Sequence, residues 1–240
     1  MMHISQLIKQ FNDVSKTELS FHLPNKYRLL GDYTFENKGS SIYWPFDDHC
    51  ILVDSLSGEV TEIPLKIKET AFILLSTPKL RTKTSEEFNT ERAEECRKAV
   101  EIINKRKSIQ SLTELSLADY REIEHFFPNP LLKKRAYHIV SEQYRVNEAV
   151  KAIRNDNHIM FGKLMKASNA SFIEYYDFFD EEVKELFDLI KESNIIGYRL
   201  LSGHHFGNIL CLVEQKMLDT FKKSLKEQDQ EIEFEEIIQL

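Results

Sequence analysis

Gly197–Val213 reads GYRLLSGHHFGNILCLV, and this stretch combines two apolar, β-prone runs with a short centre rich in glycine and histidine. The runs, Tyr198–Leu201 and Ile209–Val213, have the length and composition of buried strands. A strand, a turn of small residues and a second strand form a common way to bring backbone N–H groups close to a ligand. Here, bulky imidazole and phenyl side chains fill half of the turn. We therefore predict a hairpin, and the stretch alone leaves open whether its turn approaches a phosphate.

The residues on both sides of this hairpin have helical periodicity, because apolar residues recur at three- and four-residue spacing from residue 84 onward. Thr84-Ser-Glu-Glu87 resembles a capping box, and Pro128-Asn-Pro130 ends a helical pattern. The predicted helices begin after Thr84, Ser116 and Asp180, span residues 131–153 and 157–165, and include one marked by Leu218, Phe221 and Leu225.

Short β-prone runs separated by turn residues make up the first third of the chain, after a short amphipathic helix at residues 4–11. The predicted strands are Tyr27–Leu30, Ile42–Phe46, Ile51–Val53, Val60–Leu65 and Ala71–Ser76. At the other end, Gln228–Glu236 fits either a solvated acidic end or an edge strand that contains Ile232 and Phe234. The composition changes near residue 83. We therefore predict an α+β fold with a sheet domain at 1–83 and a helix-rich domain with antiparallel strands at 84–240.

The composition narrows the class of protein. The 240 residues are 42% hydrophobic and 30% charged, as in ordinary globular proteins, and the net charge of −7 disfavours nucleic acid as the main partner. No apolar run reaches the roughly 20 residues that span a bilayer, and no signal peptide is recognisable, so we expect no membrane partner. Cys50, Cys96 and Cys211 lack metal or redox spacing and predict buried thiols in a reducing cytoplasm.

Two long patterns lie within the predicted helices. Arg135–Val146 reads RAYHIVSEQYRV, and Phe161–Ser171 reads FGKLMKASNAS. The first resembles the galactokinase pattern Arg-x-x-His-Val-Val-x-Glu-x-x-Arg-Val, and the second resembles Phe-Gly-x-Leu-Met-x-x-Ser-His-x-Ser. Upstream, Phe88–Arg92 resembles the family's Tyr-Asn-x-Arg-Arg helix start. Two such matches in order are hard to obtain by chance, so the chain is similar to galactokinases, members of the GHMP kinase superfamily.

The resemblance extends to the N-terminal half. Leu23–Gly39, LPNKYRLLGDYTFENKG, resembles a degraded copy of the first family signature, APGRVNLIGEHTDYNGG, and Ile51–Gly58 resembles a later strand of the galactokinase N-terminal domain. The fold that this implies is a GHMP-kinase-like α+β fold with a shortened N-terminal sheet domain.

The resemblance also assigns positions that contact the sugar in the family. Lys26 occupies the position of an arginine in the family, Asp32 that of a glutamate, and Tyr33 that of a histidine. Phe88 occupies the position of a tyrosine and lacks its hydroxyl group. Arg81 lies near the family's basic residue. Buried hydroxyl recognition depends on such fixed polar partners. A sugar pocket formed by these residues would differ from the pocket of the family. Alternatively, the charged residues among them are solvated residues on the surface.

The family segment that holds the phosphate loop and the catalytic aspartate has no counterpart. The glycines are Gly31, Gly39, Gly58, Gly162, Gly197, Gly203 and Gly207, and none lies in a GxG or Gly-Leu-Ser-Ser-Ser arrangement. Phosphoryl transfer in this superfamily depends on backbone N–H groups of such a loop. We therefore predict no catalytic residue and no cofactor, with ATP and Mg as the alternative. Four aspartates are candidates for a catalytic base by their residue type alone: Asp32, Asp47, Asp48 and Asp54. For the last three, the simpler interpretation is that the side chain stabilises a turn.

The opening hairpin corresponds to the third family signature, Gly-x-Arg-Met-Thr-Gly-Gly-Gly-Phe-Gly-Gly-Cys. The chain keeps Gly197, Arg199, Gly203 and Gly207, and the turn is a degenerate form of the motif because other small residues are replaced. The turn residues concerned are Ser202, Gly203, His204, His205 and Gly207. Because adjacent strand residues point to opposite faces, the histidine pair predicts no metal site. We interpret the stretch as a structural hairpin.

These patterns predict a galactokinase-like protein without ATP-dependent sugar kinase activity, which acts as a cytoplasmic binding or regulatory module. Two alternatives stay open. One is an active small-molecule kinase that transfers the γ-phosphate of ATP to a galactose-type sugar, and the other is a subunit completed by a partner chain. The expected partners are a small sugar and a second copy or another chain, which would cover surfaces exposed by the shortened sheet domain.

Overall fold

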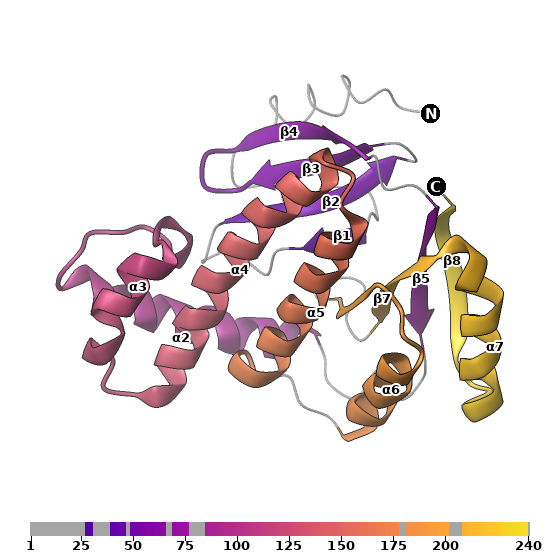
Figure 1. Cartoon of the computed structure of the whole chain (residues 1–240). Coiled ribbons are helices and arrows are strands. Elements are labelled where there is room, and N and C mark those ends of the chain that lie inside the picture. The colour runs from indigo at the N-terminus through magenta and orange to yellow at the C-terminus, as the bar shows by residue number, and fades with distance from the viewer. Residues whose placement is uncertain are drawn as a thin grey trace. The chain divides into compact units, whose positions relative to one another are not determined.

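The structure, a computed structural model, describes residues 27–30, 39–46, 49–65, 69–76, 85–177, 181–201 and 208–239. Figure 1 shows the described residues as coloured ribbons. These residues form two compact units, each drawn from two separate parts of the chain. The first unit takes its residues from 1–64 and 93–146, and the second from 65–92 and 147–240. The predicted domain boundary at residue 83 stays a prediction.

The first unit contains an antiparallel sheet whose strands follow one another in chain order. Its strands are β1 (Tyr27–Leu30), β2 (Ser40–Phe46), β3 (His49–Asp54) and β4 (Glu59–Pro64). The predicted meander is therefore confirmed. Between β3 and β4 the Asp54 carboxylate accepts hydrogen bonds from the backbone N–H groups of Leu56 and Ser57. Asp54 thus stabilises a turn, as predicted.

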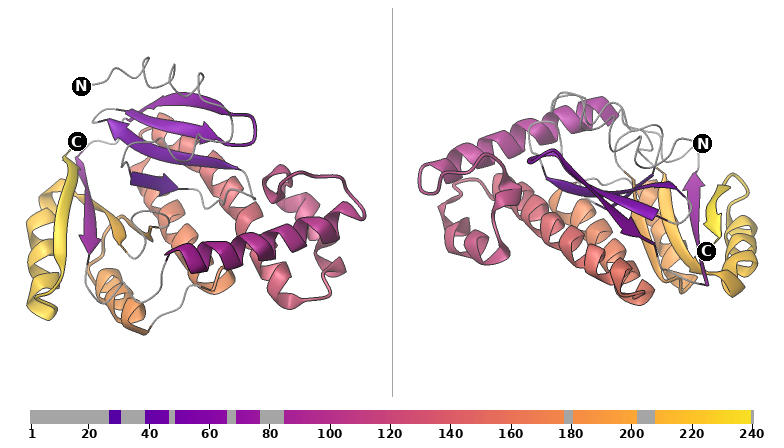
Figure 2. Two further views of the ribbon diagram at one scale, coloured as in Figure 1. Left: turned by 180° about the vertical axis from the view of Figure 1, so that it is seen from behind. Right: turned by 90° about the horizontal axis from the view of Figure 1, so that it is seen from above.

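Helices α2 (Ser85–Asn104), α3 (Leu117–Ile123) and α4 (Pro130–Arg154) confirm three of the predicted helices. Ser116 begins α3 with a capping box, in which its hydroxyl accepts from the Asp119 N–H while the Asp119 carboxylate accepts from Ser116. Two short 3-10 helices, Leu112–Glu114 and Glu124–Phe126, connect these segments. Within the first unit, α4 lies along one face of the sheet (Figure 2), where the Gln143 side chain accepts from the Ser40 N–H at 2.9 Å.

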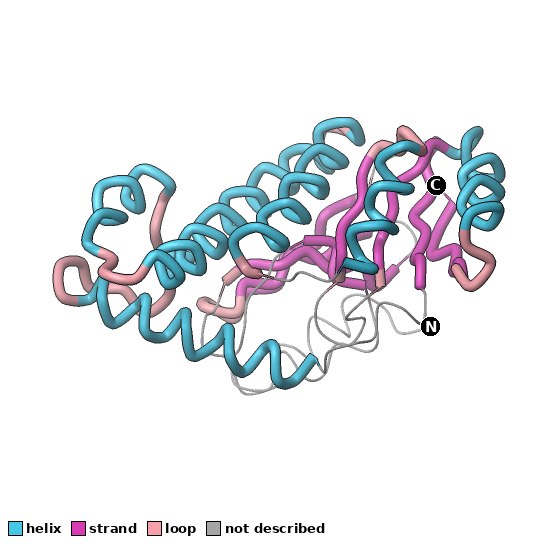
Figure 3. The backbone as a smooth tube through the Cα atoms, turned by 90° about the horizontal axis from the view of Figure 1, so that it is seen from below, coloured by secondary structure: helices cyan, strands magenta, loops and turns pink. Residues whose placement is uncertain are grey.

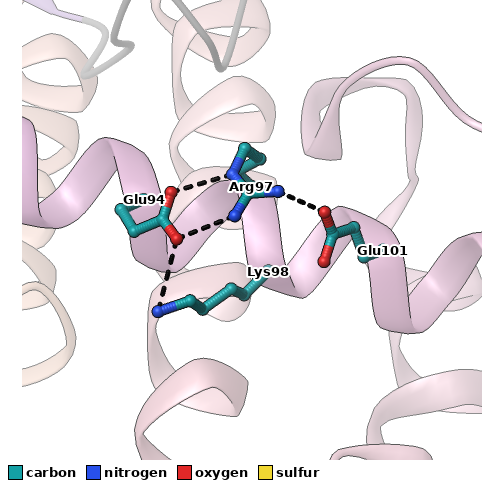
Figure 4. Close-up of polar contacts among 4 residues, drawn as sticks. All are labelled: Glu94, Arg97, Lys98 and Glu101. Atoms are coloured by element: carbon teal, nitrogen blue, oxygen red, sulfur yellow. Dashed lines mark hydrogen bonds and ion pairs between the residues drawn. The ribbon is translucent and has the colours of Figure 1, made fainter.

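The exposed side of α2 carries a network of ion pairs (Figure 4). Arg97 donates to both carboxylate oxygens of Glu94 at 2.8 Å and to Glu101, and the Lys98 ammonium lies 3.3 Å from Glu94. The Arg97 hydrogen bonds lower the pKa of Glu94 to about 2. Because these side chains are about half exposed to solvent, the network contributes little to stability compared with a buried pair.

The second unit contains a sheet in the strand order β6-β7-β5-β8. Its strands are β5 (Thr70–Ser76), β6 (Gly197–Leu200), β7 (Ile209–Glu214) and β8 (Glu233–Gln239), with every pair antiparallel. The two runs predicted from the sequence of Gly197–Val213 are therefore paired strands. Of the two alternatives for the acidic segment Gln228–Glu236, the edge strand is confirmed in part, because β8 contains Phe234 but begins after Ile232, and Gln228 ends α7. Phe72, Ile73 and Leu75 of the central strand β5 are fully buried, and each contributes about 1.5–3 kcal/mol by burial.

Among the described residues, the helices that lie wholly within this unit are α5 (His158–Tyr175), α6 (Glu181–Glu192) and α7 (Leu218–Gln228). Figure 3 shows α7 beside β8, and the Phe221 and Phe234 rings of these elements lie 6.5 Å apart between centroids. The prediction that α5 ends at Met165 was wrong, because the helix continues for three more turns. Small polar residues in that stretch argue against a helix in the sequence, but here they are buried and bonded to neighbours, so tertiary contacts outweigh propensity.

Several predicted features lie outside the described residues. These are the helix at residues 4–11, Asp47 and Asp48, and the cap residues Thr84 and Asp180. The three cysteines are described, and all are buried free thiols, as predicted. Burial raises the pKa of the Cys50 and Cys211 thiols above its ordinary value, so both are held as neutral thiols.

Candidate functional site

Most of the predicted site residues lie outside the part of the chain that the structure describes. The residues concerned are Lys26, Asp32, Tyr33 and Arg81 of the sugar site and Ser202, Gly203, His204, His205 and Gly207 of the third signature. Their roles stay predictions. Phe88 is the one member of the predicted sugar site within the described ranges.

Phe88 lies in an aromatic cluster inside the second unit. Its ring is 3% exposed and packs against the rings of Phe172 and Tyr176, with centroids 5.8 and 6.0 Å away. The Arg92 guanidinium carbon lies 5.0 Å from the same ring centroid, which is a cation–π arrangement. These contacts hold the first turn of α2 to the end of α5. The Phe88 ring is therefore part of a core.

The family-like pattern on α4 forms a buried row of charged and polar side chains. Arg135, 1% exposed, donates from Nε to Glu95 Oε2 at 2.7 Å, which joins α4 to α2 within the first unit. His138 is fully buried, and Glu142 accepts from Arg145 Nε at 2.7 Å. Such ions in a core require paired charges, because an isolated buried ion is costly to desolvate.

The family-like pattern on α5 brings a helix and a strand into close contact. Gly162 faces Gly197 of β6, and a Cβ atom on Gly162 would lie 2.4 Å from the carbonyl oxygen of Ile196. A Cβ atom on Gly197 would lie 2.6 Å from the Gly162 Cα atom. Only glycine fits at these two positions without movement of the backbone. The glycines therefore set the distance between α5 and β6.

Neutral side chains of α5 then fix the position of β6. Ser168 Oγ accepts from Arg199 Nε at 2.8 Å, and Asn169 Oδ1 accepts from the Leu200 N–H at 2.9 Å. All of these groups are buried. Because β6 is an edge strand among the described residues, the bond to the Leu200 N–H occupies a backbone position that a further strand would otherwise take.

One pocket of about 390 Å³ in the second unit is lined by Glu69, His158, Glu214, Gln215 and Lys216. It lies where β7 ends and α5 begins. Lys216 Nζ donates to Glu214 Oε2 at 2.7 Å, a bond that lowers the pKa of Glu214 and raises that of Lys216. The Gln215 N–H donates to the Glu69 carbonyl oxygen at 2.9 Å. Glu69 has a φ of 55°, so its backbone lies in the left-handed region at this edge of the pocket.

Sequence reasoning missed this pocket, because its residues come from three separate segments and match no spacing pattern. It did identify the glycines and the charged row, through the resemblance rather than through their contacts. Within the described ranges, no three His, Cys, Asp or Glu side chains are grouped so as to hold a metal ion. Among the same residues, no helix has both the length and the apolar character to cross a membrane.

Comparison with solved structures places these elements in a known fold class. A crystal structure of Lactococcus lactis galactokinase complexed with galactose matches with a TM-score of 0.70 and 26% identity, over 79% of this chain and 50% of that one. A crystal structure of a mevalonate kinase matches with a TM-score of 0.51 and 14% identity, over 80% of this chain and 47% of that one. The fold is that of the GHMP kinases.

Sequence comparison gives the family within that class. Galactokinases of Clostridium tetani and Clostridium acetobutylicum are each 31% identical to this chain, over 179 and 180 residues. These alignments cover 74% and 75% of this chain, and 45% and 46% of the two relatives. No family model matches the chain. The chain belongs to the galactokinase family, and it spans about half the length of the curated relatives that it matches.

Proposed function

We propose that this chain is a galactokinase-like binding or regulatory module without ATP-dependent sugar kinase activity, which binds a small galactose-type sugar in the cytoplasm. The observation that carries the proposal is the absence of a Gly-Leu-Ser-Ser-Ser loop or any GxG arrangement from the sequence, in a chain of this family. Without such a loop, the chain lacks the backbone N–H groups that bind the nucleotide phosphates in this superfamily.

The described glycines support this interpretation, because each has a role in packing or in a turn of the backbone. Gly162 and Gly197 allow a helix to approach a strand, and Gly39 lies against Thr113. Gly58 has a φ of 77° in the turn after β3. ATP with Mg is the cofactor that the family implies, and these residues do not fit a phosphate cradle.

The environment of Phe88 supports an altered sugar site. A tyrosine at this position would supply a hydroxyl group, whereas the buried phenyl ring of Phe88 packs against Phe172 and Tyr176. Loss of one polar partner weakens the recognition of a sugar hydroxyl, because the hydroxyl then lies unpaired in the complex. The proposal is therefore sugar binding weaker or different in specificity from that of an intact galactokinase.

Isothermal titration calorimetry with galactose and separately with Mg-ATP tests the proposal. We expect heat from galactose and none from Mg-ATP, and Asp32→Asn should weaken galactose binding by tenfold or more. Asp156→Asn is the matched control, because Asp156 is exposed and has a φ of 54°, where asparagine is well tolerated. Tight Mg-ATP binding, or equal binding by wild type and Asp32→Asn, would contradict the proposal.

The second candidate is an active sugar kinase, alone or completed by a partner chain. The observation that favours it is the 31% identity to galactokinases. A coupled assay of ADP release with galactose and Mg-ATP tests it, on the purified chain and on material isolated with its partners from the native host. Turnover in either preparation would replace the first proposal, and turnover in the second preparation alone would identify a partner chain as necessary.

A further inference from the structure

Lys166 of α5 lies against the start of β6 in the second unit. Its Nζ atom donates to the Ile195 carbonyl oxygen at 2.6 Å and lies 5.6 Å from the centroid of the Tyr198 ring, which is a cation–π arrangement. The side chain is half-buried. Both partners are neutral, and within the described ranges Lys166 forms no ion pair. The amino group is therefore partly removed from water without a carboxylate to balance its charge.

This environment changes the protonation of the amino group. Burial lowers the pKa of Lys166, because removal of water disfavours the charged form. Near neutral pH, a larger fraction of this amine is therefore free of its proton than in a solvated lysine. A free amine is a nucleophile, whereas an ammonium has no lone pair to share. The Ile195 carbonyl oxygen accepts a hydrogen bond from either form, so loss of the proton preserves that contact.

Other lysines of the same unit have different surroundings. Lys191 and Lys216 each donate to a carboxylate, and that hydrogen bond raises the pKa of both amines and keeps them protonated. Lys163 lies three residues before Lys166 on α5, is exposed, and forms no ion pair within the described ranges. Lys163 is therefore the matched comparison for Lys166, because the two differ in their exposure to water.

We propose that Lys166 is a modification site, at which small acyl phosphates acylate the Nζ atom without an enzyme. The free amine attacks the carbonyl carbon of the acyl phosphate. A C–N bond forms, the C–O bond to the phosphate breaks, and inorganic phosphate leaves with the electron pair of that bond. The nitrogen releases its extra proton to solvent. Because such a donor transfers its acyl group directly, the reactivity of each amine decides which lysine is modified.

Acylation acts on the contact between α5 and β6. The amide nitrogen of the product carries no charge, so its attraction to the Tyr198 ring is lost, and the acyl group needs room beside Ile195. The same helix and strand are already in close contact at Gly162 and Gly197. Acylation of Lys166 should therefore weaken the attachment of β6 to α5.

Acetyl phosphate is the probe for the first test, and mass spectrometry of peptides gives the acylation rate of each lysine. In the folded wild-type protein at pH 7, Lys166 should react about threefold faster than Lys163, although it is less exposed. In concentrated urea the two rates should become equal, because neither amine is then buried. Lys166→Arg should abolish the fast reaction, and Lys163→Arg should preserve it. Equal rates in the folded protein, or a faster reaction at Lys163, would overturn the proposal.

The pH dependence of the two rates separates a reactive amine from one that the reagent merely reaches easily. As the pH rises toward the ordinary pKa of a lysine, Lys163 loses its proton and gains reactivity, whereas a larger part of Lys166 is already unprotonated. The ratio of the Lys166 rate to the Lys163 rate should therefore fall with increasing pH. A ratio that stays constant would attribute the preference to access alone and would contradict the proposed site.

Amide hydrogen exchange tests the effect on β6. Lys166→Gln removes the charge, as acylation does, and exchange at the amides of β6 should be about threefold faster than in the wild type. Lys163→Gln is the matched control and should exchange as the wild type does. The acetylated wild-type protein should resemble Lys166→Gln. Unchanged exchange in both Lys166→Gln and the acetylated protein would overturn the proposed effect of the modification.

Discussion

Helices α4 and α5 both carry family-like sequence patterns, but they are held to their neighbours by opposite means. On α4, buried charges do this work, through the pair between Arg135 and Glu95. On α5, glycine at position 162 allows close contact with β6, and the neutral side chains of Ser168 and Asn169 accept hydrogen bonds from that strand. The comparison teaches that a sequence pattern shared with an enzyme family can report packing as well as chemistry.

The largest effect is expected where a buried charge loses its partner. Arg135→Met removes the guanidinium that donates to Glu95 and leaves that carboxylate in a buried place. Removal of one member of such a pair costs about 3–5 kcal/mol. Urea denaturation of the wild type and the variant measures the difference.

A double-mutant cycle identifies the cause. Arg135→Met/Glu95→Met should recover much of the loss, because both charges of this pair are then removed from the interior together. Arg97→Met is the control on the exposed side of α2 and should have only a small effect. A double variant less stable than Arg135→Met alone would show that the pair is not what holds α4.

The next effect tests the close approach on α5. Gly162→Ala places a methyl group 2.4 Å from the Ile196 carbonyl oxygen, so the helix or the strand must move. We expect a loss of about 3 kcal/mol in the free energy of unfolding, at the upper end of typical overpacking. Ala170→Ser is the control, since it adds one atom to an exposed position of the same helix. An unchanged melting temperature for Gly162→Ala would show that the close contact at this glycine is not what holds α5 to β6.

A smaller effect is expected from the hydrogen bonds of α5. Ser168→Ala removes the hydroxyl that accepts from Arg199 Nε, and hydrogen bonds to charged groups contribute about 1.5–3 kcal/mol. The variant should therefore be less stable by about 1.5 kcal/mol in urea denaturation. Ser168→Thr keeps the hydroxyl and should retain more of the stability. Equal losses in both variants would attribute the effect to packing.

The smallest effect is expected at the exposed network of α2, and it depends on pH. The pKa of Glu94 is about 2, below its ordinary value of 4.5, because Arg97 donates to the ionised carboxylate. A lowered pKa means that the stabilisation is present above pH 4.5 and is lost as pH falls toward 2. Glu94→Gln should therefore lower the melting temperature slightly at pH 7 and not at pH 2. A difference that persists at pH 2 would show that the charge is not its source.

Much of the fold was predictable from local sequence. Turn residues and β-prone runs gave the strands of the first sheet, and Ser116 marked the start of α3 through its capping box. The length of α5 was not predictable in the same way, because Ser168 and Asn169 weigh against a helix unless their partners on β6 are known. Local patterns report local structure, and contacts distant in sequence override them.

The candidate site was less predictable than the fold. The pair of Arg135 and Glu95 joins residues 40 positions apart, and no spacing rule connects them. The pocket brings Glu69 and Glu214 together only because β5 pairs with β7. The roles assigned through the resemblance, such as that of Phe88, depend on positions rather than contacts, and they stay predictions.

The central place of β5 has a consequence for synthesis of the chain. This strand leaves the ribosome early, yet both of its neighbours in the sheet, β7 and β8, belong to residues 209–239. Its apolar residues must therefore wait for most of the chain before they are covered. Pairing between distant segments slows folding and exposes strands to aggregation. We expect nascent chains that stop before residue 209 to be clients of ribosome-associated chaperones, and β5 to be the segment that these chaperones bind.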